Sequence, residues 1–399
     1  MDVFTSAAEL LRHYRPERPV LCLRPHAAAR AACWFLANFP GQVLYAAKAN
    51  DSQAIIDALV EAGITQFDVA STAEIARMAA VPDAELYFMN PVKSRGSIRA
   101  AYDQFGVRNF AFDSDEEFDK ILEESGRAPD LNLYLRITCP NTHSLIPLEG
   151  KFGVSMAEAP ALLLRARQVA RRLGITFHVG SQAVVPAAFG DALRQVGQLI
   201  VTSGVLVDAI DIGGGFPSRY PHSDPPELAG YTDEIAKAWD ELAVKDSCKL
   251  LCEPGRALVA EAESVLVRVD ARRDNALYVN DGAFGTLFDA AYMGFRFPAR
   301  LIGATGARAK GEAEFSVYGP TCDSCDYLPG PFMLPPSVKE GDYIEIGQIG
   351  AYGRVLANRF NGFGEYDEAV LTDEPMLSMY QTEEEQGLPS IAPLKTARA

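Results

Sequence analysis

The sequence contains no apolar run long enough to cross a bilayer, and residues 1–19 lack the apolar core of a secretory signal peptide. It also lacks an excess of positive charge: 53 Asp and Glu outnumber 37 Lys and Arg, giving a formal net charge of −16. Nucleic-acid phosphates would repel such a chain, so we expect neither a nucleic-acid nor a membrane partner. The seven cysteines are odd in number and scattered, which favours reduced thiols over a disulfide framework. Together these features predict an acidic cytoplasmic protein.

Eight short apolar runs alternate with amphipathic stretches between residues 20 and 255. The runs are Val43–Lys48, Gln66–Ser71, Glu85–Asn90, Asn109–Ser114, Leu131–Thr138, Ile175–Gly180, Ala209–Gly215 and Lys249–Gly255. Strand–helix alternation indicates a parallel sheet, and eight units over this length are typical of a (β/α)8 TIM-like barrel. A doubly wound open sheet is the alternative, but no G-x-G-x-x-G opens the first unit.

Helical patterns fill the gaps between these runs. The segments are Gln53–Ala62, Thr72–Ala80, Ser97–Phe105, Ala157–Leu173, Ala187–Thr202 and Glu227–Val244. Two of them have start signals, Asp51-Ser52 before the first and Ser71-Thr72-Ala73-Glu74 at the second.

After Arg256 the pattern changes to short strands joined by turn-rich loops, as in an all-β domain. The expected strands are Ser264–Val269, Ala276–Asn280, Glu314–Tyr318 and Tyr343–Ile346. We expect residues 319–336 to form a loop, because they are rich in Pro, Gly, Asp and Cys. The sequence therefore predicts an α/β barrel over 20–255, a C-terminal all-β domain over 256–372 joined by 1–19, and a mobile tail over 373–399.

Polar residues gather where the apolar runs end. In a barrel, these carboxyl ends of the strands carry the catalytic residues. Reading them in order gives Lys48, Asp68, Asn90, Asp113, Arg136, His178 and Glu253. Each also has a structural explanation: an aspartate can cap a helix, and a histidine can lie satisfied in a core.

Lys48 and the glycines suggest a specific chemistry. A lysine ending a buried strand can have a lowered amine pKa, and a neutral amine forms a Schiff base with a carbonyl compound. Successive glycines at Gly213–Gly215, and Gly255 before Arg256, let backbone N–H groups converge on an anion. A lysine opposite a phosphate cup describes a pyridoxal 5'-phosphate site. Glu253 would then face the pyridine nitrogen.

Ten motifs in order extend this interpretation over about residues 20–372. They are YAAKAN, FDVASTAE, NPVKS, KFG, FHVGSQ, IDIGGGFP, CEPGR, VNDG, GPTCDSCD and GAYGRVLANRFNGF. With them the chain resembles the ornithine/lysine/diaminopimelate decarboxylase family, and its eukaryotic-type ornithine decarboxylases in particular. These are fold type III (alanine-racemase-like) pyridoxal-phosphate enzymes.

The resemblance implies a role for each matching residue. Lys48, Cys322, His178 and Glu253 would be catalytic, with Lys48 bonded to the cofactor and His178 stacked on its ring. The cofactor-binding set would be Lys48, Asp68, Arg136, His178, Ser181, Gly214, Gly215, Glu253, Gly255, Arg256 and Tyr352. Glu74 would brace the cofactor as well, and Lys151 would lie on a mobile loop, Cys139–Gly153, over the site.

The resemblance also implies a homodimer with shared active sites. Cys322 and Asp323 would enter the partner's site, where Cys322 returns a proton to the substrate and Asp323 pairs with its distal ammonium. Cys322-Asp-Ser-Cys325 has the C-x-x-C spacing of a zinc or redox motif, but no second pair or histidine pair accompanies it. We therefore expect no metal.

One departure from the family concerns the substrate. The family's second acidic contact follows the Asn-Asp-Gly turn at a distance where this chain has Tyr292 and Met293, and Asp289 is the nearest carboxylate. The residues assigned to substrate contact are Asp323, Tyr292, Asp289 and Phe360.

These assignments predict decarboxylation of a basic L-amino acid, ornithine first and lysine second, giving putrescine or cadaverine. The alternatives are a larger or dicarboxylic substrate, such as diaminopimelate or carboxynorspermidine, or a non-catalytic regulatory homologue. A racemase would need a second base, usually a tyrosine, at the position of Cys322.

Overall fold

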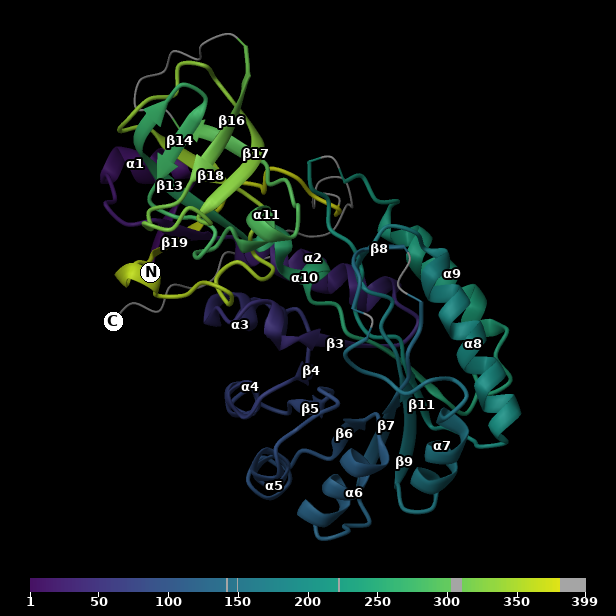
Figure 1. Ribbon diagram of the computed structural model, residues 1–399. Coiled ribbons are helices and arrows are strands. Elements are labelled where there is room, and N and C mark those ends of the chain that lie inside the picture. The colour runs from purple at the N-terminus through teal and green to yellow at the C-terminus, as the bar shows by residue number, and fades with distance from the viewer. Residues whose placement is uncertain (141–142, 149, 222, 303–310, 381–399) are drawn as a thin grey trace.

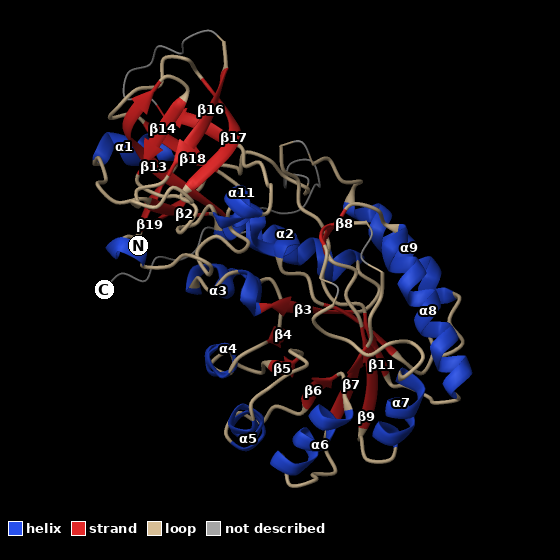
Figure 2. Ribbon diagram, in the orientation of Figure 1, coloured by secondary structure: helices blue, strands red, loops and turns tan. Residues whose placement is uncertain are grey.

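The computed structural model describes residues 1–140, 143–148, 150–221, 223–302 and 311–380. It consists of a closed β-barrel surrounded by helices and a second, β-rich domain beside it (Figure 1). Figure 2 shows how the strands of the second domain gather at one end of the molecule. The predicted fold class, a TIM-like barrel followed by a C-terminal sheet domain, is confirmed.

Eight parallel strands close the barrel in the order β11-β12-β3-β4-β5-β6-β7-β9. Their bounds are β3 Gln42–Ala46, β4 Gln66–Val69, β5 Glu85–Phe88, β6 Asn109–Phe112, β7 Asn132–Arg136, β9 Arg172–Thr176, β11 Ala209–Asp211 and β12 Lys249–Cys252. All eight predicted runs overlap one of these strands. The sixth begins earlier than expected, because the helical pattern predicted over 157–173 ends at Arg167 and Arg172 already lies in β9.

Helices pack around the outside of the barrel (Figure 1). They are α2 Pro25–Asn38, α3 Gln53–Glu61, α4 Thr72–Met78, α5 Arg95–Asp103, α6 Asp115–Glu124, α7 Ala159–Arg167, α8 Ala187–Ser203, α9 Leu228–Asp240 and the short α10 Arg256–Val259. The start predicted at Ser71 is confirmed, because its hydroxyl accepts the backbone N–H of Glu74 at 3.2 Å. Ser52 also precedes its helix, but its side chain makes no capping bond.

Large side chains fill the barrel interior. Tyr87 and Tyr134 meet there edge to face, with ring centroids 5.9 Å apart. A β-carbon at Gly174 would lie 2.3 Å from the Tyr134 ring, so β9 must have glycine at that position. The interior is therefore packed rather than open, and a ligand can enter only beyond the carboxyl ends of the strands.

The second domain is a nine-stranded sheet that includes the first and the last strand of the described chain, β1 and β19. Its strands are β1 Asp2–Phe4, β2 Val20–Leu23, β13 Glu263–Arg273, β14 Ala276–Val279, β15 Ala299–Ile302, β16 Ala313–Tyr318, β17 Tyr327–Leu334, β18 Tyr343–Ile346 and β19 Asp367–Leu371. The buried strand β2 pairs with β13 and β19, so it belongs to this sheet. The barrel was predicted to begin at residue 20 and so to include β2. This boundary was wrong by the four residues of β2, which belong to the sheet.

Two expectations about the C-terminal part also differ from the structure. Residues 327–334 form β17, whereas the whole of 319–336 was predicted as a loop. Pro329 and Pro331 lack N–H donors, but β17 ends the sheet order and pairs with β16 alone, where a proline is tolerated. Residues 373–380 of the predicted mobile tail pack onto the protein, and 381–399 lie outside the described residues.

The remaining elements are short. They are α1 Ala7–His13, η1 Ala47–Ala49, β8 Ser144–Ile146, β10 Ser181–Ala183, η2 Ala260–Ala262, α11 Phe288–Tyr292 and η3 Phe360–Gly362. Within the described ranges, none of the helices has the length and apolar character needed to span a membrane.

Candidate active site

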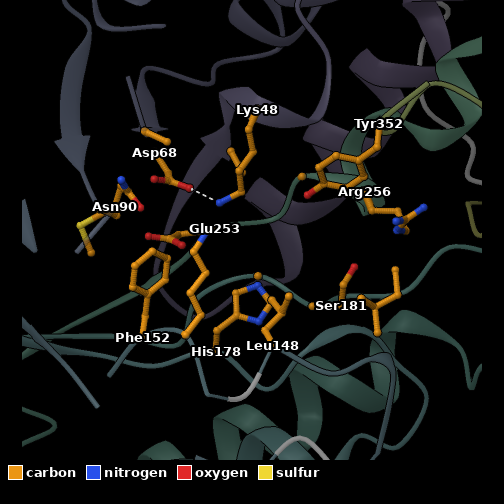
Figure 3. Close-up of a pocket in the computed structure, with 18 of the residues that line it drawn as sticks. Lys48, Asp68, Asn90, Leu148, Phe152, His178, Ser181, Glu253, Arg256 and Tyr352 are labelled. Carbon is orange, nitrogen blue, oxygen red and sulfur yellow. Dashed lines mark hydrogen bonds and ion pairs between the residues drawn. The ribbon is translucent and has the colours of Figure 1, made fainter. Parts of the chain in front are cut away.

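A cavity of about 600 Å³ lies at the carboxyl ends of the barrel strands (Figure 3). All eleven residues predicted to bind the cofactor line it: Lys48, Asp68, Arg136, His178, Ser181, Gly214, Gly215, Glu253, Gly255, Arg256 and Tyr352. Their positions span nearly the whole barrel sequence and part of the sheet domain. The fold thus brings together residues that lie far apart in the sequence.

Lys48 points into this cavity from η1, the single turn that follows β3. Its Nζ lies 2.9 Å from Asp68 Oδ2, and the side chain is 43% exposed because it faces the open cavity. Burial alone would lower the Lys48 pKa, but Asp68, Tyr352 and Glu253 outweigh it and raise the pKa above its ordinary value. The sequence-based expectation of a lowered amine pKa was therefore wrong, since it considered burial without the neighbouring acids.

Glu253 follows β12 and is 3% exposed. Its Oε1 is buried without a hydrogen-bond partner among the described residues. Burial, followed by the charges of Asp211 and Asp68, raises the Glu253 pKa well above its ordinary value. Asp211 ends β11 with its own carboxylate held by Thr176 Oγ1 and the Gly213 N–H, both at 2.9 Å. Asp211 and Glu253 therefore form a buried acid pair that favours retaining a proton.

His178 is neutral in this site. Burial, with Arg136 and Lys48 nearby, lowers its pKa well below the ordinary value. Its Nδ1 accepts the Gly180 N–H at 3.0 Å, so the ring proton resides on Nε2. A neutral, flat ring held by the backbone at one edge is suited to stacking against another ring.

The glycines of the turn after β11 are required by close packing. Gly213 and Gly215 adopt φ values of +67° and +105°, which favour glycine. A β-carbon at Gly214 would lie 2.7 Å from the Glu253 carbonyl oxygen and 3.1 Å from His178 Nε2. The turn therefore presents bare backbone to the cavity.

Arg256 is 4% exposed and is fixed on two sides. Its guanidinium donates to the Tyr220 hydroxyl at 2.9 Å and to Asp289 Oδ2 at 3.0 Å, while Nε has no partner among the described residues. The Tyr352 ring lies 5.0 Å from the guanidinium carbon. Asp289 also lines the cavity, but its carboxylate is already paired with Arg256.

The segment over the cavity is anchored on both sides. In its described part, β8 pairs with β10 in an antiparallel ribbon, and the Gly153 N–H donates to Asp113 Oδ2 at 2.8 Å. Lys151, Phe152 and Leu148 line the cavity. Residues 141, 142 and 149 of the predicted loop Cys139–Gly153 lie outside the described residues.

Glu74 does not line the cavity, and neither do four of the residues predicted for catalysis or substrate contact. Cys322 is exposed, with its backbone N–H and Sγ on Asn361 Oδ1 at 3.2 and 3.3 Å. Asp323 accepts the Cys325 N–H at 2.8 Å. Tyr292 and Phe360 are 47% and 42% exposed, and Met293 lines the cavity next to Tyr292. Within one chain, these four residues do not meet Lys48.

Sequence reasoning missed Asp211 and Tyr220, which hold Glu253 and Arg256. Asp211 lies inside the quoted motif IDIGGGFP, so a polar residue in an apolar strand was the available signal. Tyr220 lies beyond that motif, and nothing in the local sequence indicates its contact with Arg256.

The cavity fits a ring that carries an aldehyde and a phosphate. Lys48 supplies an amine, Glu253 Oε1 is an unpaired buried acceptor opposite it, and the glycine turn with Arg256 Nε supplies donors for an anion. Glu253 Oε1 and Arg256 Nε are both buried without a hydrogen-bond partner among the described residues. A bound pyridoxal 5'-phosphate would supply these partners.

Two family models match the sequence. "Pyridoxal-dependent decarboxylase, pyridoxal binding domain" matches residues 26–260, and "Pyridoxal-dependent decarboxylase, C-terminal sheet domain" matches residues 256–350. These ranges correspond to the barrel and to most of the sheet domain.

Known proteins are similar over most of the chain. The lysine/ornithine decarboxylase of Selenomonas ruminantium is 32% identical over 354 residues, covering 86% of each chain. The ornithine decarboxylase of Panagrellus redivivus is 33% identical over 359 residues, covering 84% of this chain and 80% of the relative. The crystal structure of the Paramecium bursaria Chlorella virus arginine decarboxylase bound to agmatine superposes with a TM-score of 0.81. It shows 26% identity and covers 91% of this chain and 98% of that chain.

Proposed function

The chain belongs to the pyridoxal-dependent decarboxylases, and we propose that it removes the α-carboxylate of a basic L-amino acid, ornithine first and lysine second. Its cofactor is pyridoxal 5'-phosphate, and its reaction class is amino-acid decarboxylation. The observation that carries the proposal is the cavity that joins Lys48, Glu253 and Arg256.

Different residues of the cavity would bind different parts of the cofactor. Arg256, Tyr352, Ser181 and the glycine turn would hold its phosphate, and His178 would stack on its ring. When bound, pyridoxal phosphate supplies the electron sink for the electron pair that remains once carbon dioxide leaves. Glu253, a buried acid with a raised pKa, would hold a proton at the ring nitrogen.

Lys48 must lose a proton from Nζ before it can react with a carbonyl group. Asp68 Oδ2, at 2.9 Å, stabilises the charged form of the amine and fixes it in the cavity. Asp68 would thus act as an anchor for Lys48.

We further propose that the chain is active as a homodimer with shared sites. Asp326 builds the loop that carries Cys322 and Asp323: it accepts from the Ala283 N–H at 2.7 Å and from the Thr321 N–H and hydroxyl at 3.0 and 2.8 Å. A rigid loop that presents a thiol and a carboxylate outside its own cavity is suited to complete the cavity of a second copy. Cys322 would return a proton to the substrate there.

Substrate selection would then depend on Asp323 of the partner copy. Asp289 is held by Arg256, and the cavity wall at the position of the family's second acid is Met293. A single carboxylate recognises a distal ammonium without fixing its distance from Cα closely. This supports ornithine and lysine as substrates together, as in the name of the Selenomonas relative.

We also propose a cytoplasmic location. All seven cysteines lie in the described ranges, and no disulfide joins any two of them. This cysteine state and the acidic composition support a reducing compartment.

The direct test is carbon dioxide release from ornithine, lysine, arginine and diaminopimelate with added pyridoxal phosphate. We expect turnover of ornithine and lysine. Preference for diaminopimelate would replace the basic substrate by a dicarboxylic one. Cofactor binding without turnover of any substrate would indicate a non-catalytic homologue.

A further inference from the structure

Residues 373–380, which we call the C-terminal strap, cross from the sheet domain to the barrel. Asp373 anchors one end: its Oδ1 accepts from Arg24 and its Oδ2 from Arg300, both at 2.8 Å. The next residue, Glu374, pairs with Arg30 of α2 at 2.7 Å. The strap is thereby fixed to both domains before it reaches the cavity region.

The other end of the strap binds the short helical segment α10–η2. The Tyr380 hydroxyl donates to the Ala257 carbonyl at 2.6 Å. The Ser378 hydroxyl and the Met379 N–H donate to the two carboxylate oxygens of Glu261, each at 2.6 Å. Tyr380, Met379 and Glu261 are 5%, 6% and 4% exposed, so these bonds are shielded from water.

These contacts lie directly behind Arg256. Helix α10 has only four residues and begins at Arg256, so it cannot stabilise its own geometry. Ala257, whose carbonyl the strap holds, is the next residue. The position of the Arg256 backbone therefore depends on what packs against α10.

The turn that carries the second phosphate-site residue, Tyr352, packs on the same segment through Gly350. The Gly350 N–H donates to the Ala260 carbonyl at 3.1 Å, and a β-carbon at Gly350 would lie 1.9 Å from the Val259 carbonyl oxygen. Tyr352 follows two residues later and lines the cavity. The segment α10–η2 thus contacts both the strap and the turn that carries Tyr352.

We infer that the C-terminal strap positions the phosphate site, with the Tyr380 hydroxyl as the positioning group that fixes α10 and thereby Arg256. This inference rests on the proposed placement of the cofactor phosphate at Arg256. Tyr380 touches neither the cavity nor Arg256 itself, so its effect is confined to how well the site is arranged to hold an anion.

Tyr380→Phe tests the inference against a matched control, Tyr343→Phe. Tyr343 is equally buried at 5% exposed, and its hydroxyl donates to the Pro16 carbonyl at 2.9 Å, within the sheet domain. Both variants lose one buried hydrogen bond, so both should lower the melting temperature of the apoprotein. We expect only Tyr380→Phe to raise the dissociation constant of pyridoxal phosphate, by on the order of 10-fold.

Pyridoxal, which lacks the phosphate, provides a second readout. Its dissociation constant, measured by titrating the same apoproteins, should be unchanged by Tyr380→Phe. Equal losses of pyridoxal phosphate affinity in the two tyrosine variants, or an equal loss of pyridoxal affinity in Tyr380→Phe, would overturn the inference.

Two truncations and one site variant complete the experiment. A chain ending at Tyr380 should bind pyridoxal phosphate as the full chain does, and one ending at Thr372 should bind it on the order of 100-fold more weakly. Equal weakening in both would assign the effect to residues 381–399 and overturn the inference.

Arg256→Met distinguishes the proposed phosphate placement from the proposed role of the strap. If it leaves affinity unchanged, the proposed phosphate placement fails; if it weakens affinity and Tyr380→Phe does not, the inference alone fails.

Discussion

At the scale of single residues, the electrostatics of the site depend on Lys48 and the carboxyl groups around it. Asp68 and Glu253 both raise the pKa of Lys48, and Asp211 raises that of Glu253. One proton shared by Asp211 and Glu253 lowers the repulsion within this group. These pKa shifts favour a charged amine on Lys48 and a protonated acid in the Asp211–Glu253 pair.

Glu253→Gln tests the role of that acid. Glutamine retains the shape but cannot hold or release a proton, so we expect kcat to fall on the order of 10²-fold while the dissociation constant of the cofactor changes little. Steady-state kinetics at saturating pyridoxal phosphate gives kcat. A normal kcat in this variant would mean that the proton of Glu253 is not used in the reaction.

Asp323→Ala and Asp289→Ala test the substrate contact. An ammonium left without its buried partner costs roughly 3–5 kcal/mol, so Asp323→Ala should lower kcat/KM for ornithine and lysine by two to three orders of magnitude. Asp289→Ala should instead weaken pyridoxal phosphate binding, because it releases Arg256. The values of kcat/KM and the cofactor dissociation constants of both variants separate these roles. If Asp323→Ala left both substrates unaffected, the basic-amino-acid proposal would fail.

Glu263 makes stability depend on pH. Burial raises its pKa to about 7, although Arg354 and Asn50 act in the opposite direction. A folded-state pKa above the unfolded value of about 4.3 contributes stability that is complete below pH 4.3 and is lost as pH rises through 7. The unfolding free energy of wild type, relative to Glu263→Gln, should therefore fall between pH 5 and 7 by at most roughly 1 kcal/mol per pH unit.

Urea unfolding of the cofactor-saturated proteins at pH 5, 6, 7 and 8 measures this difference. Glu116→Gln, on the exposed face of α6, controls for the loss of a carboxylate. A difference between wild type and Glu263→Gln that stayed constant across these pH values would contradict the raised pKa.

At the scale of elements, the turn after β11 determines the width of the cavity. It lies between His178 and the backbone of Glu253. The space between these two groups is too narrow for a side chain at Gly214. The turn therefore links the position of His178 to that of Glu253, the acid that follows β12.

Gly214→Ala should show this coupling. The new methyl group would push against His178 and the Glu253 carbonyl, and overpacking of this kind costs about 1–3 kcal/mol, so cofactor affinity should drop by 10- to 100-fold. Gly96→Ala in α5 is the control, because a β-carbon there meets nothing within 4 Å. Spectroscopic titration with pyridoxal phosphate gives both constants. Equal affinities would show that the turn has room to move.

Prediction from sequence worked for elements with a clear hydrophobic pattern. It failed where the outcome depends on contacts that form only in the folded protein. The barrel strands follow from apolar runs between helical patterns. Most of the predicted cofactor residues follow from their places at strand ends, whereas Ser181 and Tyr352 were predicted only from the resemblance to the family. Strand β17 was missed because its prolines are compatible only with an outer position in the sheet, which no local pattern reveals. The direction of the Lys48 pKa shift could not be predicted either. Asp68 approaches Lys48 only through the pairing of β4 with β3, and Glu253 only through the pairing of β12 with β3 that closes the barrel.

At the scale of the whole molecule, one chain forms a cavity that lacks the residues expected to contact the distal end of the substrate. Cys322 and Asp323 stand exposed on a loop of the sheet domain, fixed by Asp326. The complete catalytic unit is therefore proposed to be the dimer.

Mixing Lys48→Ala and Cys322→Ala proteins tests that proposal. Each homodimer should be nearly inactive, but a mixed dimer contains one site with both residues intact. Random exchange makes half of the dimers mixed, so about a quarter of wild-type activity should return. Activity that stayed at the level of the unmixed variants, although subunit exchange was verified by a size-tagged chain, would show that each chain builds its own site.

The pairing of β2 with β13 and β19 has a consequence for biosynthesis. A ribosome releases β2 before any barrel strand, yet both of its neighbours in the sheet emerge only after the barrel is complete. Throughout that interval the nascent chain carries an apolar strand with two bare hydrogen-bonding edges, the kind of segment that chaperones recognise and that aggregates when left unprotected. Slow translation of the barrel would therefore lengthen the exposure of β2, whereas a circular permutant that begins at α2 would make β2 after both of its neighbours and remove the delay.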